Sequence, residues 1–223
     1  SGLTTDQVAG MTTAQVAGMT TDQVKRLSAS QVAALTTAHA AALTTDQVVA
    51  LSTAQAASLS TTSAAALTSA QVAALETADL AKLSTDAIAA LTTAALRGLG
   101  SDQVAALTTG QLAAVSTAQL ASLTTAQVAA LTTVQASKLS TDQVTALTTV
   151  QVAAFETADL AKLSTDAVVS LSTAQLHVLS TDQISSMTSA QTAALTSDQV
   201  GSLTTPQLAA LLAGTQMSTM TTA

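Results

Sequence analysis

The octapeptide Leu-Thr-Thr-Asp-Gln-Val-Val-Ala at residues 43–50 is one copy of a unit that repeats along nearly the whole chain. Every eighth residue from Leu3 to Leu211 is large and apolar, and no insertion or deletion interrupts the series. These positions hold Leu, apart from the variants Met11, Met19, Val115, Phe155 and Met187. A fixed short period indicates a repeat architecture, in which each unit buries its apolar face against its neighbours.

Helix-start signals recur at fixed places in the octad, which we number from slot 0, the large apolar residue, to slot 7. Slot 1 is Ser or Thr in nearly every octad, and slot 4 is mostly Gln. A hydroxyl residue followed three residues later by Gln matches the capping box, and Leu at slot 0 with Val at slot 5 matches the hydrophobic staple. Slot 2 also carries a hydroxyl residue in all octads but the one with Ala29, so slots 1 and 2 both stay open as the cap.

The charged residues give an independent sign of helix direction. All 13 Asp and Glu residues fall in slots 1, 3 or 4, and all six Lys and Arg residues fall in slots 6 or 7. A helix dipole favours acids near the start of a helix and bases near its end. The charge pattern therefore predicts one short helix per octad.

We predict an all-α fold, a solenoid of very short helices with one helix in each of about 26 octads. One continuous helix fails, because a period of eight residues makes the Leu stripe drift by ~80° per octad. The alternative is a β-solenoid, but slots 0 and 5 differ by an odd number and would face opposite sides of a strand. The string Glu-Thr-Ala-Asp-Leu-Ala-Lys-Leu recurs at 76–83 and 156–163, ten octads apart, which favours two octads per superhelical turn.

The octad register sets the expected organisation of the chain. Residues 1–2 are interpreted as an expression scar, residues 3–211 as one continuous solenoid, and residues 212–223 as an irregular tail. Neither end carries a unit with a polar outer face, as the terminal caps of a solenoid should. We therefore expect the array to continue in a larger parent protein.

The composition narrows the classes of function. The net charge is −7 and there is no basic cluster, so nucleic-acid binding is not expected. Cysteine is absent, which leaves no disulfide and no thiolate metal site. Hydroxyl residues interrupt every octad, so no transmembrane helix is expected.

The candidate site residues each have a simpler structural interpretation. His39 stands in slot 4, the Gln slot, and His177 in slot 6, which is expected to point away from the core. We interpret both as chance substitutions within the repeat. The pairs Glu76/Asp79 and Glu156/Asp159 could act as acid and base, but we interpret the Glu residues as dipole-matched caps that Lys82 and Lys162 neutralise. A calcium ladder of slot-3 Asp residues is disfavoured, because Asp never occupies that slot in adjacent octads. We predict no catalytic, cofactor or metal site and no enzyme activity.

Tracts such as Leu-Thr-Thr-Ala-Gln-Val-Ala-Ala at 123–130 resemble octapeptide repeats of large secreted or surface proteins of bacteria. The resemblance covers residues 3–211 and implies an extracellular or cell-surface location and a stalk or spacer role, as in an adhesin. Two alternatives stay open: an ice-binding face rich in Thr and Ala, and a solenoid that binds other proteins or associates with itself. A membrane-surface role is disfavoured by the scarcity of Lys and Arg.

Overall fold

Each octad forms one short helix in the computed structural model, which describes residues 2–220 and the side chains of residues 2–214. The chain divides into two compact units, residues 1–115 and 116–223, and each is described by itself. The helices of the first unit are α1 (Thr5–Ala9), α2 (Thr13–Ala17), α3 (Thr21–Lys25), α4 (Ala29–Ala33), α5 (Thr37–Ala42), α6 (Thr45–Val49), α7 (Thr53–Ala57), α8 (Thr61–Ala65), α9 (Ser69–Ala74), α10 (Thr77–Leu80), α11 (Thr85–Ala90), α12 (Thr93–Arg97), α13 (Ser101–Ala106) and α14 (Thr109–Ala114).

The second unit continues the pattern in the same octad register. Its helices are α15 (Thr117–Ala121), α16 (Thr125–Ala129), α17 (Thr133–Ala136), α18 (Thr141–Ala146), α19 (Thr149–Ala153), α20 (Thr157–Leu160), α21 (Thr165–Ser170), α22 (Thr173–His177), α23 (Thr181–Ser185), α24 (Ser189–Ala194), α25 (Ser197–Gly201) and α26 (Thr205–Met220). Residues 2–220 contain no strand. The all-α solenoid is confirmed, and the β-solenoid alternative is wrong.

The N-cap of each octad helix is the residue in slot 1, which settles the choice that the sequence left open. In α6, the hydroxyl of Thr44 accepts from the Gln47 N–H at 3.2 Å, and the Thr44 N–H donates to Gln47 Oε1 at 2.9 Å. No residue in the described part of the chain has a positive φ, so no left-handed glycine ends these helices. Each helix ends because the backbone becomes extended at the N-cap of the next helix. Leu43 and Thr44, for example, are both extended between α5 and α6.

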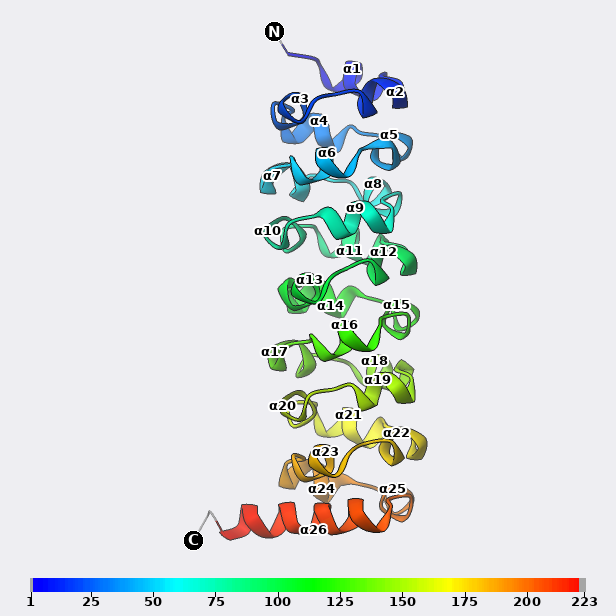
Figure 1. Cartoon of the computed structure of the whole chain (residues 1–223), viewed down its shortest axis with the longest axis vertical. Coiled ribbons are helices and arrows are strands. Elements are labelled where there is room, and N and C mark those ends of the chain that lie inside the picture. The colour runs from blue at the N-terminus through cyan, green and yellow to red at the C-terminus, as the bar shows by residue number, and fades with distance from the viewer. Residues whose placement is uncertain (1, 221–223) are drawn as a thin grey trace. The chain divides into compact units, whose positions relative to one another are not determined.

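Within each unit, the helices stack so that a helix contacts the one three octads further along. In the first unit, α2, α5, α8, α11 and α14 form one such series, and α1, α4, α7, α10 and α13 form a second. Figure 1 shows α2 and α5 one beneath the other. The second unit repeats the arrangement in the series α15, α18, α21 and α24.

The prediction of two octads per superhelical turn is therefore wrong, because the stacked helices are three octads apart. It rested on the spacing of two similar octads, which carries no information about packing. Two layers of helices would leave the slot-5 side chain open on one side, whereas Val72 and Val152 are fully buried. With helices on three sides, slots 0 and 5 of the inner turns of each unit face a shared core, which reduces the apolar area left in water.

The octad pattern ends in the longer helix α26, which contacts α23 and α24. It lies across the end of the second unit, in red in Figure 1. The expected irregular tail at 212–223 is thus wrong for residues 212–220, and residues 221–223 lie outside the described residues. The hydroxyl pair of slots 1 and 2 does not follow Leu211, where Leu212 and Ala213 stand instead, so no cap interrupts the helix.

Candidate functional site

A ladder of buried glutamine side chains joins successive turns of each unit. Gln47 is 2 % exposed, and its Oε1 is held by the cap of its own helix. Its Nε2 donates to the Met19 carbonyl at 2.7 Å and to the Val16 carbonyl at 2.9 Å. One amide therefore starts a helix with its oxygen and binds the preceding turn with its nitrogen.

The same two-ended contact recurs with the same sequence separation. In each case Nε2 donates to the slot-0 carbonyl 28 residues earlier, as Gln71 does to Leu43 at 2.7 Å. Other glutamines with this contact include Gln31, Gln55, Gln103, Gln111, Gln151, Gln175, Gln183, Gln191, Gln199 and Gln207.

The glutamine ladder pairs backbone carbonyls that very short helices leave without hydrogen bonds. The last four carbonyls of an α-helix have no partner within it, so a helix of five residues leaves most of its carbonyls unpaired. A buried carbonyl without a partner costs roughly 1–3 kcal/mol. The Gln amides satisfy several of these carbonyls, so we expect the stability of one turn to depend on the turn that follows it.

His39 takes over both contacts of the glutamine it replaces. Its Nδ1 lies 3.3 Å from the Thr36 N–H and its Nε2 lies 2.8 Å from the Met11 carbonyl, again 28 residues earlier. A backbone N–H can only donate, so Nδ1 accepts and Nε2 carries the hydrogen. His39 is a structural substitute for Gln. His177 is exposed, with Nδ1 3.1 Å from the Ser202 carbonyl.

Smaller residues replace glutamine in slot 4 of some octads. Ser63 is fully buried and donates to the Leu35 carbonyl at 2.8 Å. Ala95 offers no donor, and its helix α12 packs directly against α9. A Cβ at Gly98 would lie 2.7 Å from the Ser69 carbonyl oxygen, so only glycine permits this close approach.

Two octads place an acid in the glutamine slot. Asp79 and Asp159 are 3 % and 2 % exposed, and Oδ2 of Asp159 is buried without a hydrogen-bond partner. Burial and, to a lesser extent, the negative charge of Glu156 together raise the pKa of Asp159 to about 6. Burial likewise raises the pKa of Asp79, partly offset by a hydrogen bond from Thr53, and Glu76 adds to the rise.

The glutamates of these octads stand at the N-cap, as predicted, but their side chains make no cap hydrogen bond. Among the described residues, no ion pair joins Lys82 or Lys162 to these glutamates. Glu76 and Asp79 line a hollow of about 530 Å³ together with Lys25 and Asp46. The structure thus brings each acidic pair together, but with one acid buried and one exposed.

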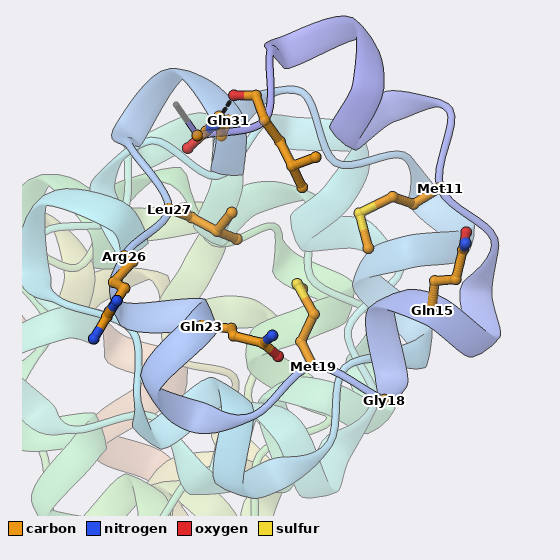
Figure 2. A pocket seen from close by; sticks show the side chains of 10 residues that line it. Met11, Gln15, Gly18, Met19, Gln23, Arg26, Leu27 and Gln31 are labelled. Atoms are coloured by element: carbon orange, nitrogen blue, oxygen red, sulfur yellow. Dashed lines mark hydrogen bonds between the residues drawn. The ribbon is translucent and has the colours of Figure 1, made fainter.

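The N-terminal edge of the first unit is an open apolar hollow. It has a volume of about 510 Å³ and is lined by Leu3, Met11, Met19 and Leu27 together with Gln15, Gln23 and Gln31. Figure 2 shows Met11, Met19 and Leu27 directed into it. Gln31 is the first glutamine with an inter-turn contact, to the Leu3 carbonyl. The glutamines before it, Gln7, Gln15 and Gln23, are exposed.

Comparison with known protein families identifies the repeat. The model of the ALTTAQ repeat matches residues 1–29, 19–53, 72–109, 105–141 and 152–189. The chain belongs to the ALTTAQ repeat family. A search of curated proteins found no match. The membership supports a repetitive structural protein and names no ligand or reaction.

The described ALTTAQ octads contain neither a metal-binding group of side chains nor a membrane-spanning helix. Within residues 2–220, no three His, Cys, Asp or Glu side chains form a group suited to a metal. No helix in the same range is long and apolar enough to span a membrane. The slot-3 Asp residues, such as Asp46 and Asp142, are exposed.

The sequence pattern missed the main role of slot 4. It assigned Gln to the capping box, which uses only the side-chain oxygen, and placed it beside the core. The signal that could have revealed the ladder is the replacement pattern, because slot 4 never holds Glu, which a purely local capping box would accept as readily as Gln. The inter-turn acceptors lie 28–31 residues away, beyond any local motif.

Proposed function

We propose that this chain is a spacer segment of a large bacterial protein at the cell surface or outside the cell, where it acts by its length and stiffness. The single observation that carries the proposal is the glutamine ladder. Within each unit, it joins successive turns by buried hydrogen bonds at fixed spacing, and we expect these bonds to resist bending and stretching.

The outward slots support the same role. Slots 3 and 6 hold mostly small or singly charged side chains, and the exposed large apolar residues such as Val134 and Val150 are scattered. A surface of this kind offers no aromatic group or basic cluster for a specific ligand. The chain is therefore suited to hold other parts of a protein apart, not to bind or convert a substrate.

The test is to change length and surface separately in the parent protein. Deleting three consecutive octads near the middle of one unit should shorten the spacing between attached probes, measured by double electron–electron resonance, while helix content per residue is kept. Replacing the same octads with three copies of Leu-Thr-Thr-Ala-Gln-Val-Ala-Ala should restore both the spacing and the function. Loss of function despite restored spacing would show a binding face instead of a spacer.

The location is tested by exposure on living cells. Protease treatment or antibody labelling of intact bacteria should reach the octads when they lie at the surface. Protection from both until the cells are lysed would contradict this part of the proposal.

The ice-binding alternative finds less support in the geometry. The slot-1 hydroxyls, which would form half of each Thr pair, accept hydrogen bonds from the amides of their own helices, as Thr44 and Thr108 do. These hydroxyls are turned to the backbone instead of forming a free flat array. Thermal hysteresis of a solution of the chain tests this alternative directly, and we expect none.

A further inference from the structure

The glutamine ladder of the second unit is interrupted between the turn α17–α19 and the turn α20–α22, a place that we call the acidic junction. Of the three slot-4 residues in α20–α22, only Gln175 carries an amide, and the other two are Asp159 and Ala167. Gln175 donates to the Leu147 carbonyl at 2.7 Å. In the next turn, α23–α25, all three slot-4 residues are glutamines that donate to a slot-0 carbonyl. The acidic junction therefore has fewer amide contacts than the junction that follows it.

Helix α20 is also weakly held at its own start. It is four residues long, and its N-cap Glu156 makes no side-chain cap hydrogen bond. The preceding helix α19 has a complete capping box between Thr148 and Gln151. Oδ2 of Asp159 is buried without a hydrogen-bond partner. A buried carboxylate that lacks a partner is much less stable as an anion than as a neutral acid, so closing this junction favours the protonated form.

The charged groups around Asp159 do not compensate its charge. Helix α20 packs against α17, which carries no titratable side chain, and against α23, which carries Asp182. Asp182 and Glu156 line one hollow of about 510 Å³, so both acids lie on the same side of the junction. The bases of the adjoining octads, Lys138 and Lys162, are exposed. No lysine or arginine among the described residues is buried with Asp159.

The corresponding junction of the first unit contains the same acid but better compensation. Asp79 accepts a hydrogen bond from Thr53, and Lys25 lines the same hollow as Asp79. Gly98 also permits the close approach of α12 to α9, whereas the corresponding residue of the second unit is Val178, which is 40 % exposed. We therefore expect the junction in the second unit to be the more sensitive of the two.

We propose that the acidic junction is a pH-controlled joint of the solenoid, closed in acid and opening locally at neutral pH. In the open form α20 separates from α17 and the Asp159 carboxyl reaches water, while α23–α25 stay folded. The inference goes beyond the spacer role and does not depend on it, because the joint is a property of the isolated chain.

The direction of the pH effect follows from the proton that the closed form holds. Burial raises the pKa of Asp159 to about 6, whereas a solvated carboxyl releases its proton near pH 4. Below about pH 4 both forms are protonated, and closure carries no charge penalty. As the pH rises to about 6 the open form gains stability by ionising, and above that pH the closed form is weakened to its full extent.

The test is hydrogen–deuterium exchange of the chain at pH 4 and pH 7, followed by mass spectrometry of peptides. Each rate is divided by the intrinsic rate of the same amide at that pH, so that only structural opening is compared. We expect the protection of the α20 amides to fall at least about tenfold from pH 4 to pH 7. The α24 amides of the same unit should change by less than about threefold, and those of α10 should change less than those of α20.

Three variants separate titration of Asp159 from other effects. Asp159→Asn keeps the size of the side chain and should make the protection of α20 independent of pH. Glu156→Gln removes the neighbouring charge, so the opening should level off at a lower pH than in the parent chain. Asp142→Asn is the matched control, because it removes an exposed slot-3 carboxylate and should leave the pH dependence unchanged.

Three results would overturn the proposal. They are α20 protection that does not change with pH, an equal change in Asp159→Asn, and a simultaneous loss of protection throughout the second unit. The last result would mean global unfolding instead of a local joint. Should Asp159→Asn fail to fold, Asp159→Gln replaces it, since glutamine fills slot 4 in α19 and α23, and the same outcomes apply.

Discussion

The neighbouring helices α19 and α20 show what one side chain decides in this fold. Both belong to the second unit and both bury their slot-4 side chain, Gln151 at 3 % and Asp159 at 2 % exposure. Gln151 donates to the Leu120 and Leu123 carbonyls and accepts from the Thr148 N–H. Asp159 has an oxygen with no partner. Two adjacent octads with similar backbones thus differ in hydrogen bonding, since the slot-4 side chain is fully paired in α19 and partly unpaired in α20.

The difference follows from hydrogen-bond chemistry. An amide has a donor and an acceptor at opposite corners, which suits a site with an N–H on one side and carbonyls on the other. An ionised carboxylate only accepts, so it repels the carbonyls that the amide would bind. Burial of such a group favours its protonated form, in agreement with the raised pKa of Asp159.

The largest expected effect comes from making a glutamine junction acidic. Gln151→Glu keeps the cap but places a carboxylate against the Leu120 and Leu123 carbonyls, and it should cost about 3–5 kcal/mol at pH 7. The free energy of unfolding, measured by denaturant titration, checks this. Gln7→Glu is the control, since Gln7 is exposed and has no inter-turn contact, and it should change stability by less than about 0.5 kcal/mol. Equal effects at both positions would mean that the ladder contributes nothing.

Helix α12 has alanine, Ala95, in slot 4 and packs closely against α9. Gly98→Ala should destabilise the chain by about 1–3 kcal/mol, because the new Cβ would overlap the Ser69 backbone. Gly201→Ala is the matched control, as a Cβ there meets nothing within 4 Å and alanine favours a helix. We expect the melting temperature to fall for the first variant and to stay or rise for the second. A tolerated Gly98→Ala would show that α9 and α12 are free to separate.

Restoring the amide should repair the acidic junction. Asp159→Gln returns a donor that can reach the Leu131 carbonyl, 28 residues earlier, and removes a buried charge. We expect a gain of about 1–3 kcal/mol at pH 7. A loss of stability would mean that α20 lies too close to the preceding turn to take the longer side chain.

The pH dependence of stability reports on the same carboxyl. Because folding raises the pKa of Asp159 from its ordinary value to about 6, the folded chain holds this proton more tightly than the unfolded chain. The free energy of unfolding should therefore decrease as the pH rises from about 4 to about 6 and level off above that range, by roughly 1–3 kcal/mol. Asp159→Gln should reduce this slope, which thermal melts over the pH series would show. An unchanged slope would assign the effect to other groups.

The smallest effect is expected where the side chain already imitates glutamine. His39→Gln should change stability by less than about 0.5 kcal/mol at neutral pH, since both residues make the same two contacts. Melting curves at pH 7 test this, and a large loss of stability would contradict the equivalence of His39 and Gln.

Local signals in the sequence were enough to place the helices. The capping box, the staple and the slots of the charged residues all act within one octad, and the structure confirms a helix start at each slot 1. The same local reasoning identified the core positions, as Val152 and Leu131 are buried. It also interpreted His39 as a substitution in the Gln slot, and His39 makes the two contacts that Gln makes elsewhere.

The number of octads per turn, the glutamine ladder and the burial of Asp159 were decided by the tertiary structure. They depend on contacts between residues 28–31 positions apart and between helices three octads apart, and no pattern within one octad specifies them. The sequence by itself determined where each helix begins, because capping is a local interaction whose partners lie three residues apart. Only packing decided which carbonyls each amide meets, because that choice minimises the exposed apolar area of several helices at once.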